Sequence, residues 1–317
     1  MDALLLILAY LAIGLSLKRL HLMPVNTGQV LNQYVINVAV PAMILLHLPK
    51  LELNTEVLLP ALMPWLLYPL AVALILLAAR AFAWSRELTG AMLIVVPLGN
   101  TSFLGFPMVE TFFGAAGLPY AVIYDQVGSF VALAFIASTF AAVYSKDAGS
   151  SEAGAHQVDG SKGPHGVIAI AKKLLTFPPV IALFIALLFG QEAYPRVVQP
   201  LIENLAATLV PVVMIAVGFQ LHFRIPREDL FPFTFAMVVK LVVMPLVAFA
   251  VVRGLGVDSL AAQVTVLEAS MPFMISAGAI AIGAGLKPRF VASLVGYGVL
   301  LGLVTVPIWA WLLQNSS

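Results

Sequence analysis

The sequence contains no cysteine and few charged residues. The absence of cysteine excludes disulfides, thiol nucleophiles and cysteine-ligated metal sites. Charged residues make up 10% of the 317 residues, against roughly 25% in soluble domains. The formal net charge is +1, so no basic surface indicates nucleic acid as a partner. The five histidines form no H-E-x-x-H or similar pair of metal ligands. The sequence also lacks the Walker A pattern of ATP-binding proteins. We therefore expect no cofactor other than a coupling ion such as sodium.

Hydrophobic residues dominate what is present. They make up 62% of the chain, and the mean hydropathy is +1.03. A soluble domain of this length cannot bury so much apolar surface, so the partner we expect is the lipid bilayer. One membrane span takes roughly 20 residues, and the apolar fraction therefore fits about ten spans. This leaves no stretch for a soluble catalytic domain.

Charged or Pro/Gly-rich breaks divide the chain into ten predicted spans. They are expected at residues 3–17, 28–48, 58–80, 89–113, 118–144, 167–190, 198–221, 230–253, 259–284 and 290–313. A polar stretch rich in Gly, Ser and Ala lies near the midpoint and predicts a flexible linker. The expected organisation is a five-helix repeat at 1–144, the linker at 145–165 and a second five-helix repeat at 166–317.

The distribution of Lys and Arg predicts the orientation of the chain. Of these 16 residues, 12 fall in odd-numbered loops, three in even-numbered loops and one inside a span. Because cytoplasmic loops carry the excess of positive charge, the odd loops and the linker are expected in the cytoplasm. The predicted location is the cell inner membrane, with many spans and with both termini outside.

Two short self-similarities suggest that the halves are repeats. YPLAVALILL (68–77) resembles MPLVAFAVVR (244–253), and LNQYVINVAVPAMIL (31–45) resembles LIENLAATLVPVVMI (201–215). Because each half has an odd number of spans, the second copy must insert upside down. The predicted fold class is an all-α membrane protein with ten transmembrane helices arranged as two inverted five-helix repeats.

Proline, glycine and polar residues crowd the centres of the fourth and ninth spans, AMLIVVPLGNTSFLGFPMVETFF (91–113) and QVTVLEASMPFMISAGAIAIGAGL (263–286). Broken backbone at membrane depth is tolerated only where protein or a water-filled cavity satisfies it. Two interrupted helices in equivalent positions predict the binding site, where half-helix N-termini offer N–H groups to an anion and freed carbonyls bind a cation. Simple kinks without function are the alternative.

Ionisable residues inside spans are costly and mark candidate functional positions. Glu268 lies in the break of the ninth span. It either binds sodium or a coupling proton, together with Asn100 and Thr101, or pairs with Lys240 and only stabilises the fold. Lys240, in the middle of the eighth span, either balances a buried carboxylate, in place of a second cation, or attracts an anionic substrate.

The fifth span contributes a second polar group. Asp125 and Ser129 share one helix face, and Gln126 lies beside them. This group either completes a cation site or is solvated, with Asp125 near a helix end and in contact with water. Asn37, in the second span, either contacts substrate or hydrogen-bonds a neighbour, and Glu110 is expected at the surface.

Four motifs resemble those of a known family. They are GNTSFLGFP (99–107), close to N-x-G-F-L-G-x-P; EASMP (268–272); NVAVPAMIL (37–45); and PPVIALFIALLFG (178–190) followed by VGFQL (217–221). Together they resemble the auxin efflux carrier family, which includes plant PIN carriers and bacterial organic-acid carriers. One departure is Ser102, where the family usually has glycine.

The resemblance implies a fold of ten spans in inverted repeats. It also implies a scaffold of spans 1, 2, 6 and 7, a transport domain of spans 3–5 and 8–10 that moves like an elevator, and a homodimer. Sodium-coupled bile-acid carriers share this architecture, and Glu268 with Met271 resembles a sodium-site stretch of those relatives. The family's substrates are small organic anions such as dicarboxylates, lactate or indole acetate.

The function expected from all of this is secondary active transport of a small organic anion by alternating access. Sodium coupling is slightly favoured over a proton-coupled or uncoupled efflux carrier, and a membrane-embedded enzyme or a sensor is a remote alternative. No catalytic residues are assigned. The candidate substrate-binding residues are Asn100, Thr101, Ser102, Asn37, Pro272 and Ser276; the candidate sodium ligands are Glu268, Met271, Asp125, Gln126 and Ser129; and Lys240 balances charge.

Overall fold

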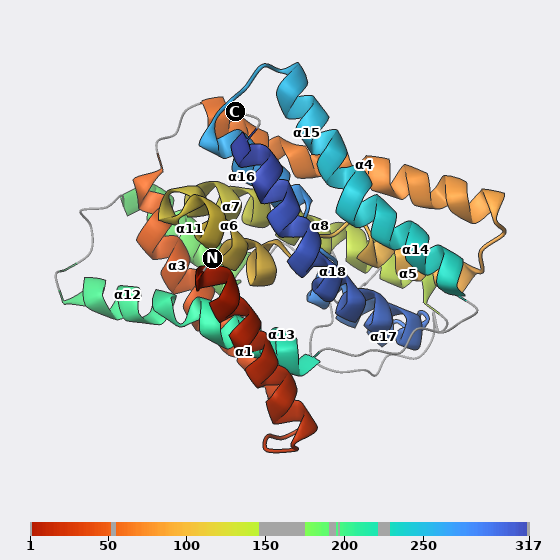
Figure 1. The fold of residues 1–317 in the computed structure, drawn as a ribbon, viewed down its shortest axis with the longest axis horizontal. Coiled ribbons are helices and arrows are strands. Elements are labelled where there is room, and N and C mark those ends of the chain that lie inside the picture. The colour runs from red at the N-terminus through yellow and green to blue at the C-terminus, as the bar shows by residue number, and fades with distance from the viewer. Residues whose placement is uncertain are drawn as a thin grey trace.

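The computed structural model describes residues 2–51, 55–145, 175–189, 195, 197–220 and 229–315. Every regular secondary-structure element in these ranges is a helix, which confirms the all-α prediction (Figure 1). The α-helices are α1 Asp2–Arg19, α2 Thr27–Tyr34, α3 Val40–His47, α4 Leu58–Ala81, α5 Arg86–Val95, α6 Phe106–Phe113, α7 Leu118–Ile123, α8 Phe130–Ala132, α9 Ser138–Tyr144, α11 Pro178–Phe189, α12 Val198–Ala207, α13 Leu209–Gln220, α14 Leu230–Val238, α15 Met244–Gly254, α16 Leu260–Ala269, α17 Ile275–Gly283 and α18 Pro288–Asn315.

Short π-helical turns join several of these helices into longer apolar segments. They are Val35–Ala39, Thr101–Gly105, Tyr124–Ser129, Leu133–Ala137 and Val239–Val243. Within the described ranges, six segments are long and apolar enough to cross a membrane: Thr27–Lys50, Thr55–Ala81, Ala115–Tyr144, Val198–Gln220, Leu230–Gly254 and Pro288–Asn315. These coincide with predicted spans, whereas the count of ten crossings and the inverted repeat stay predictions. The predicted linker lies outside the described residues from residue 146 onward.

The first and seventh predicted spans touch backbone to backbone. An ideal Cβ on Gly14 of α1 would lie 2.1 Å from the carbonyl oxygen of Ile215, and one on Gly218 of α13 would lie 2.2 Å from that of Leu11. Small residues permit this approach between helices in a membrane. The contact is reciprocal, so each helix supplies a glycine where the other presents a carbonyl.

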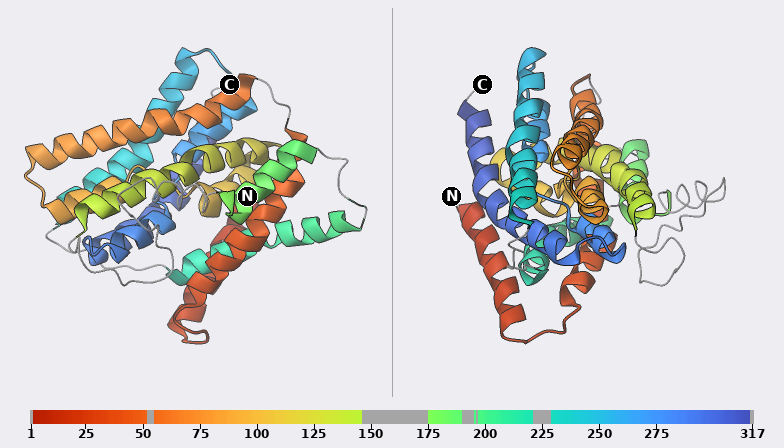
Figure 2. Two further views of the ribbon diagram at one scale, coloured as in Figure 1. Left: turned by 180° about the vertical axis from the view of Figure 1, so that it is seen from behind. Right: turned by 90° about the vertical axis from the view of Figure 1, so that its right-hand side faces the viewer.

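Helices of predicted spans 1, 2, 6 and 7 pack together on one side of the molecule (Figure 2). Helix α2 also contacts α13, and α3 contacts both α11 and α12. Helices α4 and α14–α18 lie mainly on the other side, with α4 beside α15 (Figure 1). The scaffold and transport sets that the resemblance implies, and their division into two moving domains, stay predictions.

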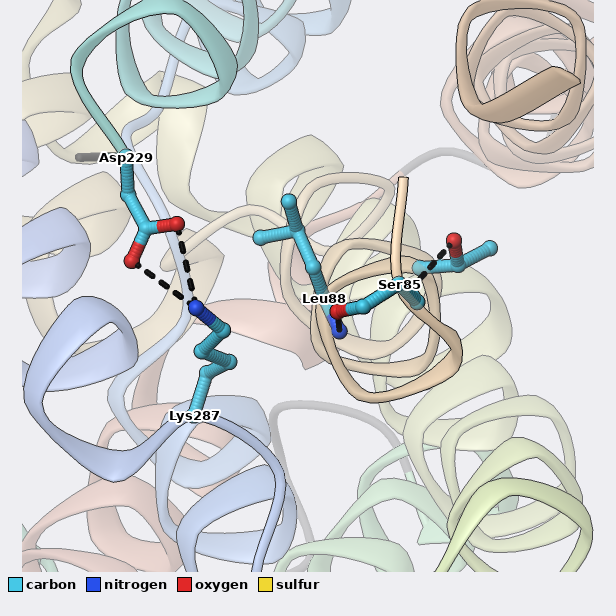
Figure 3. Close-up of polar contacts among 5 residues, drawn as sticks. Ser85, Leu88, Asp229 and Lys287 are labelled. Carbon is cyan, nitrogen blue, oxygen red and sulfur yellow. Dashed lines mark hydrogen bonds and ion pairs between the residues drawn. The ribbon is translucent and has the colours of Figure 1, made fainter. Parts of the chain in front are cut away.

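Polar side chains fix the ends of helices on the second side (Figure 3). Ser85 caps α5, because its Oγ accepts a hydrogen bond of 3.2 Å from the backbone N–H of Leu88. The Nζ of Lys287 lies 3.2 Å from Oδ1 of Asp229, so the segment before α18 is tied to the start of α14. The first of these contacts fixes the start of α5, the helix that leads into the break of the fourth span described below.

We expect Ser85→Ala to lower the free energy of unfolding by about 1 kcal/mol, because the first turn of α5 loses its acceptor. Ser85→Asp keeps an acceptor and serves as the control, with a loss of only a few tenths expected. Denaturant titration of the purified protein in detergent measures both. Equal losses in the two variants would contradict the assignment of Ser85 as a cap.

Candidate functional site

The fourth and ninth predicted spans are both broken, and the breaks meet. Helix α5 ends at Val95 and α16 ends at Ala269. The backbone N–H of Asn100 donates to the carbonyl of Pro272 at 2.7 Å, and that of Met274 donates to the carbonyl of Leu98 at 3.0 Å. These two bonds enclose an antiparallel bridge between Gly99 and Phe273. The pair of extended segments, 98–100 and 272–274, is called the crossing below.

The local sequence explains why the chain is extended here. Pro97 and Pro272 lack the N–H that would continue a helical ladder. Helix α18 makes room for the second segment with glycine: an ideal Cβ on Gly298 would lie 2.5 Å from the ring of Phe273, and one on Gly302 would lie 2.8 Å from that of Pro272. The crossing is therefore held by proline, glycine and two reciprocal hydrogen bonds.

The crossing itself offers no free N–H group at Asn100 or Met274. Both N–H groups are bonded to the opposite segment. The predicted donors are the N-termini of the half-helices, and their role in binding an anion stays a prediction. The first turns that follow also carry N–H groups that have no partner within their own helix. Ser276, which is half-buried, lies in the first turn of α17.

Asp125 is tied to the break of the fourth span. It is 1% exposed, so the alternative of a wet helix end is wrong. Its Oδ1 accepts from the Oγ1 of Thr101 at 2.5 Å and from the Oγ of Ser102 at 2.6 Å, and its Oδ2 accepts from Nε2 of Gln126 at 2.7 Å. Because both hydroxyl protons point to Asp125, Thr101 and Ser102 do not donate to a substrate in this arrangement.

Ser129 belongs to the same predicted cation group but has another partner. Its Oγ accepts a hydrogen bond of 3.1 Å from the hydroxyl of Tyr68 on α4. Tyr68 is buried, and nothing in the sequence pattern singled it out. Gln126 retains one buried oxygen, Oε1, without a hydrogen bond. The group is thus a hydrogen-bonded network between α4 and the fourth and fifth spans.

Glu268 lies at the end of α16, just before the crossing. Its side chain is 0% exposed, and neither Oε1 nor Oε2 has a hydrogen bond. An ideal Cβ on Gly105 would lie 2.3 Å from Oε2, so the carboxylate packs against the π-helical turn of the fourth span. A buried ionised carboxylate without a donor is unstable, so Glu268 requires a proton, a bound cation or a nearby positive charge.

Met271 and Glu268 are linked only through the backbone, where the N–H of Met271 donates to the carbonyl of Glu268 at 3.2 Å. In the described part of the chain, no group of three His, Cys, Asp or Glu residues is arranged to hold a metal ion. The sodium site therefore stays a prediction, with carbonyl and amide oxygens as the ligands still to be found.

Lys240 reaches the crossing from the eighth span. It is 4% exposed, and an ideal Cβ on Gly99 would lie 3.1 Å from its Nζ. Neither Glu268 nor Asp125 lies within 4.0 Å of Nζ, so the direct ion pair that we expected is not formed among the described residues. Lys240 and Glu268 still interact electrostatically at longer range.

The remaining candidates divide into two groups. Pro272 is part of the crossing. Asn37 is exposed, its Nδ2 donates to the carbonyl of Gln33 at 2.7 Å, and its π-helical turn packs on α11, α12 and α13. The structure thus does not place Asn37 at the crossing, and its role in binding stays a prediction. Glu110 is exposed, as expected.

Seven candidate positions share a backbone feature that the sequence did not reveal. The residues that lie in π-helical turns are Asn37, Thr101, Ser102, Asp125, Gln126, Ser129 and Lys240. Such turns are rare and are often found at functional sites. Two surface pockets, one lined by Lys50 and Glu203 and the other by Arg253 and Asp258, lie elsewhere, and neither is lined by residues of the crossing. We regard the crossing as the candidate site because Asn100 and Glu268 place buried polar atoms without hydrogen bonds there.

Comparison with known sequences decides the family. The sequence model of the family described as "Membrane transport protein" matches residues 1–310. The chain belongs to this family. It is the auxin efflux-like family that the four motifs predicted. With the long apolar helices, this membership shows that the transporter is a multi-pass membrane protein.

Two similar proteins cover the transporter almost end to end. One is described as an uncharacterized transporter of Methanothermobacter thermautotrophicus and is 27% identical over 314 residues, which is 98% of this chain and 97% of that protein. The other is described as an uncharacterized transporter of Methanocaldococcus jannaschii and is 24% identical over 325 residues, which is 99% of each chain. The similarity therefore includes both halves and the crossing.

Proposed function

We propose that the transporter is a secondary carrier of a small organic anion, and that the carboxylate of the anion binds at the crossing. The observation that carries this proposal is Asn100. Its Nδ2 is buried, at 2% exposure of the residue, and has no hydrogen-bond partner. A buried amide donor without an acceptor is costly, and a carboxylate supplies the acceptor. The first turns after Asn100 and Met274 add the positive ends of two half-helices.

The same geometry supports transport by alternating access. Both broken helices belong to the proposed moving set, and the scaffold consists of spans 1, 2, 6 and 7. The two reciprocal hydrogen bonds around Gly99 and Phe273 are related by a local twofold arrangement, which is what an inverted repeat requires.

We place both termini outside the inner membrane and the linker in the cytoplasm, following the distribution of Lys and Arg.

The coupling ion is assigned to Glu268, with Asp125 close enough to interact with it electrostatically. Its unpaired oxygens suit sodium, a hard cation that takes oxygen ligands, and also suit a proton. Sodium remains our first choice because the two broken spans also carry the hydroxyl oxygens of Thr101 and Ser270. Proton coupling or uncoupled efflux of organic acids is the alternative.

A thermal-shift screen tests the binding function directly. Purified transporter is heated with succinate, L-lactate or indole-3-acetate, each with and without sodium chloride at constant ionic strength. We expect at least one carboxylate to raise Tm, because a ligand at 100 times its Kd adds about 2.7 kcal/mol of stability. A larger rise with sodium than with potassium supports sodium coupling. No rise with any organic anion would contradict the proposed function.

Asn100→Ala is expected to weaken the binding of the active carboxylate by about 10- to 100-fold, because it removes the unpartnered amide donor. The fold should persist, since the crossing uses the backbone of Asn100 and not its side chain. Asn315→Ala, at the exposed end of α18, is the matched control with unchanged affinity expected. Wild-type affinity in Asn100→Ala would count against the site.

A further inference from the structure

Lys240 is the one described lysine placed in the interior of a predicted span. It lies in the π-helical turn Val239–Val243, between α14 and α15, and is 4% exposed. A charged side chain at this depth is expensive and therefore needs a specific compensating partner. The described residues provide none within hydrogen-bond or ion-pair distance of its Nζ.

The ammonium group lies against the backbone of the crossing. An ideal Cβ on Gly99 would lie 3.1 Å from Nζ and 3.5 Å from the carbonyl oxygen of Met271. A side chain at position 99 would thus meet the ammonium group, and glycine leaves this space open. The next residue, Asn100, carries the buried Nδ2 that also lacks a partner.

Two donors at adjacent residues of the crossing therefore lack acceptors. One is the Nδ2 of Asn100. The other is the charged Nζ of Lys240, which packs against Gly99. The other polar groups nearby do not compete for them. The hydroxyls of Thr101 and Ser102 are bonded to Asp125. The carboxylate of Glu268 lies against Gly105, further along the fourth span, and forms no ion pair with Lys240. What this part of the site lacks is an anionic acceptor.

We propose that Lys240 binds the negative charge of the transported carboxylate, with the amide of Asn100 as the neighbouring donor, and so makes the site selective for anions. The proposal rests on the proposed function, because it names the residue that recognises the charge of the substrate. It assigns Lys240 to the substrate and not to Glu268. A neutral isostere of the substrate leaves the ammonium group uncompensated and binds more weakly.

The experiment compares carboxylates with their neutral amides. Succinate and L-lactate are paired with succinamide and lactamide, and each affinity is taken from the ligand-dependent shift in Tm. In the wild-type protein, we expect the carboxylate of the active pair to bind about 10- to 100-fold more tightly than its amide. In Lys240→Met, which has a similar length and no charge, we expect this preference to disappear. Lys50→Met, an exposed lysine away from the crossing, is the control and should keep it.

A second variant separates charge recognition from structural charge balance. If Lys240 only compensates Glu268, the double variant Lys240→Met/Glu268→Gln regains both the wild-type Tm and the preference for carboxylates. If Lys240 binds the substrate, the double variant still lacks the preference, whatever its Tm. Glu268→Gln alone is measured as its reference, and the double variant keeps the test decisive where Lys240→Met does not fold.

The outcomes are distinguishable. Carboxylate preference at the wild-type level in Lys240→Met or in the double variant would overturn the assignment of Lys240 and leave the carrier function standing. No carboxylate response in the wild-type protein would overturn the proposed function and this inference with it. Loss of the preference in both variants, with Lys50→Met unchanged, supports the assignment.

Discussion

Gly105→Ala is expected to destabilise the transporter by about 1–3 kcal/mol and to abolish transport. The added Cβ would lie 2.3 Å from Oε2 and 2.6 Å from Oε1 of Glu268. Glu268 is 0% exposed, so its carboxylate cannot relieve the contact by turning out to solvent. Alanine gains up to about 1 kcal/mol of helix propensity over glycine, which is too little to offset the clash.

Thermal unfolding and flux in proteoliposomes measure the two effects. Gly283→Ala in α17 is the matched control, because a Cβ there has nothing within 4 Å, and we expect no loss. Adding Glu268→Ala to Gly105→Ala should restore stability but not transport, since it removes the clash together with the coupling group. Wild-type Tm and flux in Gly105→Ala would show that Glu268 does not pack against the break.

Gly14→Ala and Gly218→Ala are each expected to lower the free energy of unfolding by about 2–4 kcal/mol. Each Cβ would meet a backbone carbonyl oxygen, at 2.1 Å for Gly14 and at 2.2 Å for Gly218. Backbone atoms cannot rotate away as the end of a side chain can, so α1 and α13 must separate. Both substitutions require the same separation, so the double variant should lose less than the sum of the single variants.

Denaturant titration in detergent measures these losses. Gly254→Ala in α15 is the control, because nothing lies within 4 Å of its Cβ position. Losses below about 0.5 kcal/mol in both single variants would contradict the close contact of the first and seventh spans, since ordinary surface changes fall in that range. Strict additivity in the double variant would show that the two glycines act at separate contacts.

The breaks in the fourth and ninth spans could be predicted because their cause is local. Proline removes an N–H donor, and glycine adds flexibility, so Pro97, Gly99 and Pro272 interrupt a helix wherever they are placed. The hydrophobic runs between charged loops likewise predicted the positions of the six long apolar segments. Local composition does not say which groups the freed backbone will find, and the bonds of Asn100 and Met274 to the opposite segment were therefore not foreseen.

The partners of the buried polar residues depended on packing between distant spans. Asp125 and Thr101 were both candidates, but their hydrogen bond requires the fifth span to turn Asp125 toward the break. Lys240 was expected to pair with a carboxylate, because an isolated sequence shows charges and not distances. Its side chain instead ends beside Gly99, which only the folded chain brings near. The π-helical turns leave no mark in the hydrophobic pattern, because apolar residues surround them.

Counterflow tests the central claim most directly. Proteoliposomes containing the purified transporter are loaded with unlabelled substrate, using the carboxylate that gave the largest rise in Tm, and the entry of its radiolabelled form is followed with and without a sodium gradient. The account predicts saturable exchange in the wild-type protein and loss of exchange in Asn100→Ala, with Asn315→Ala unchanged. Exchange at the wild-type rate in Asn100→Ala, or labelled entry that does not saturate, would contradict binding of the anion at the crossing.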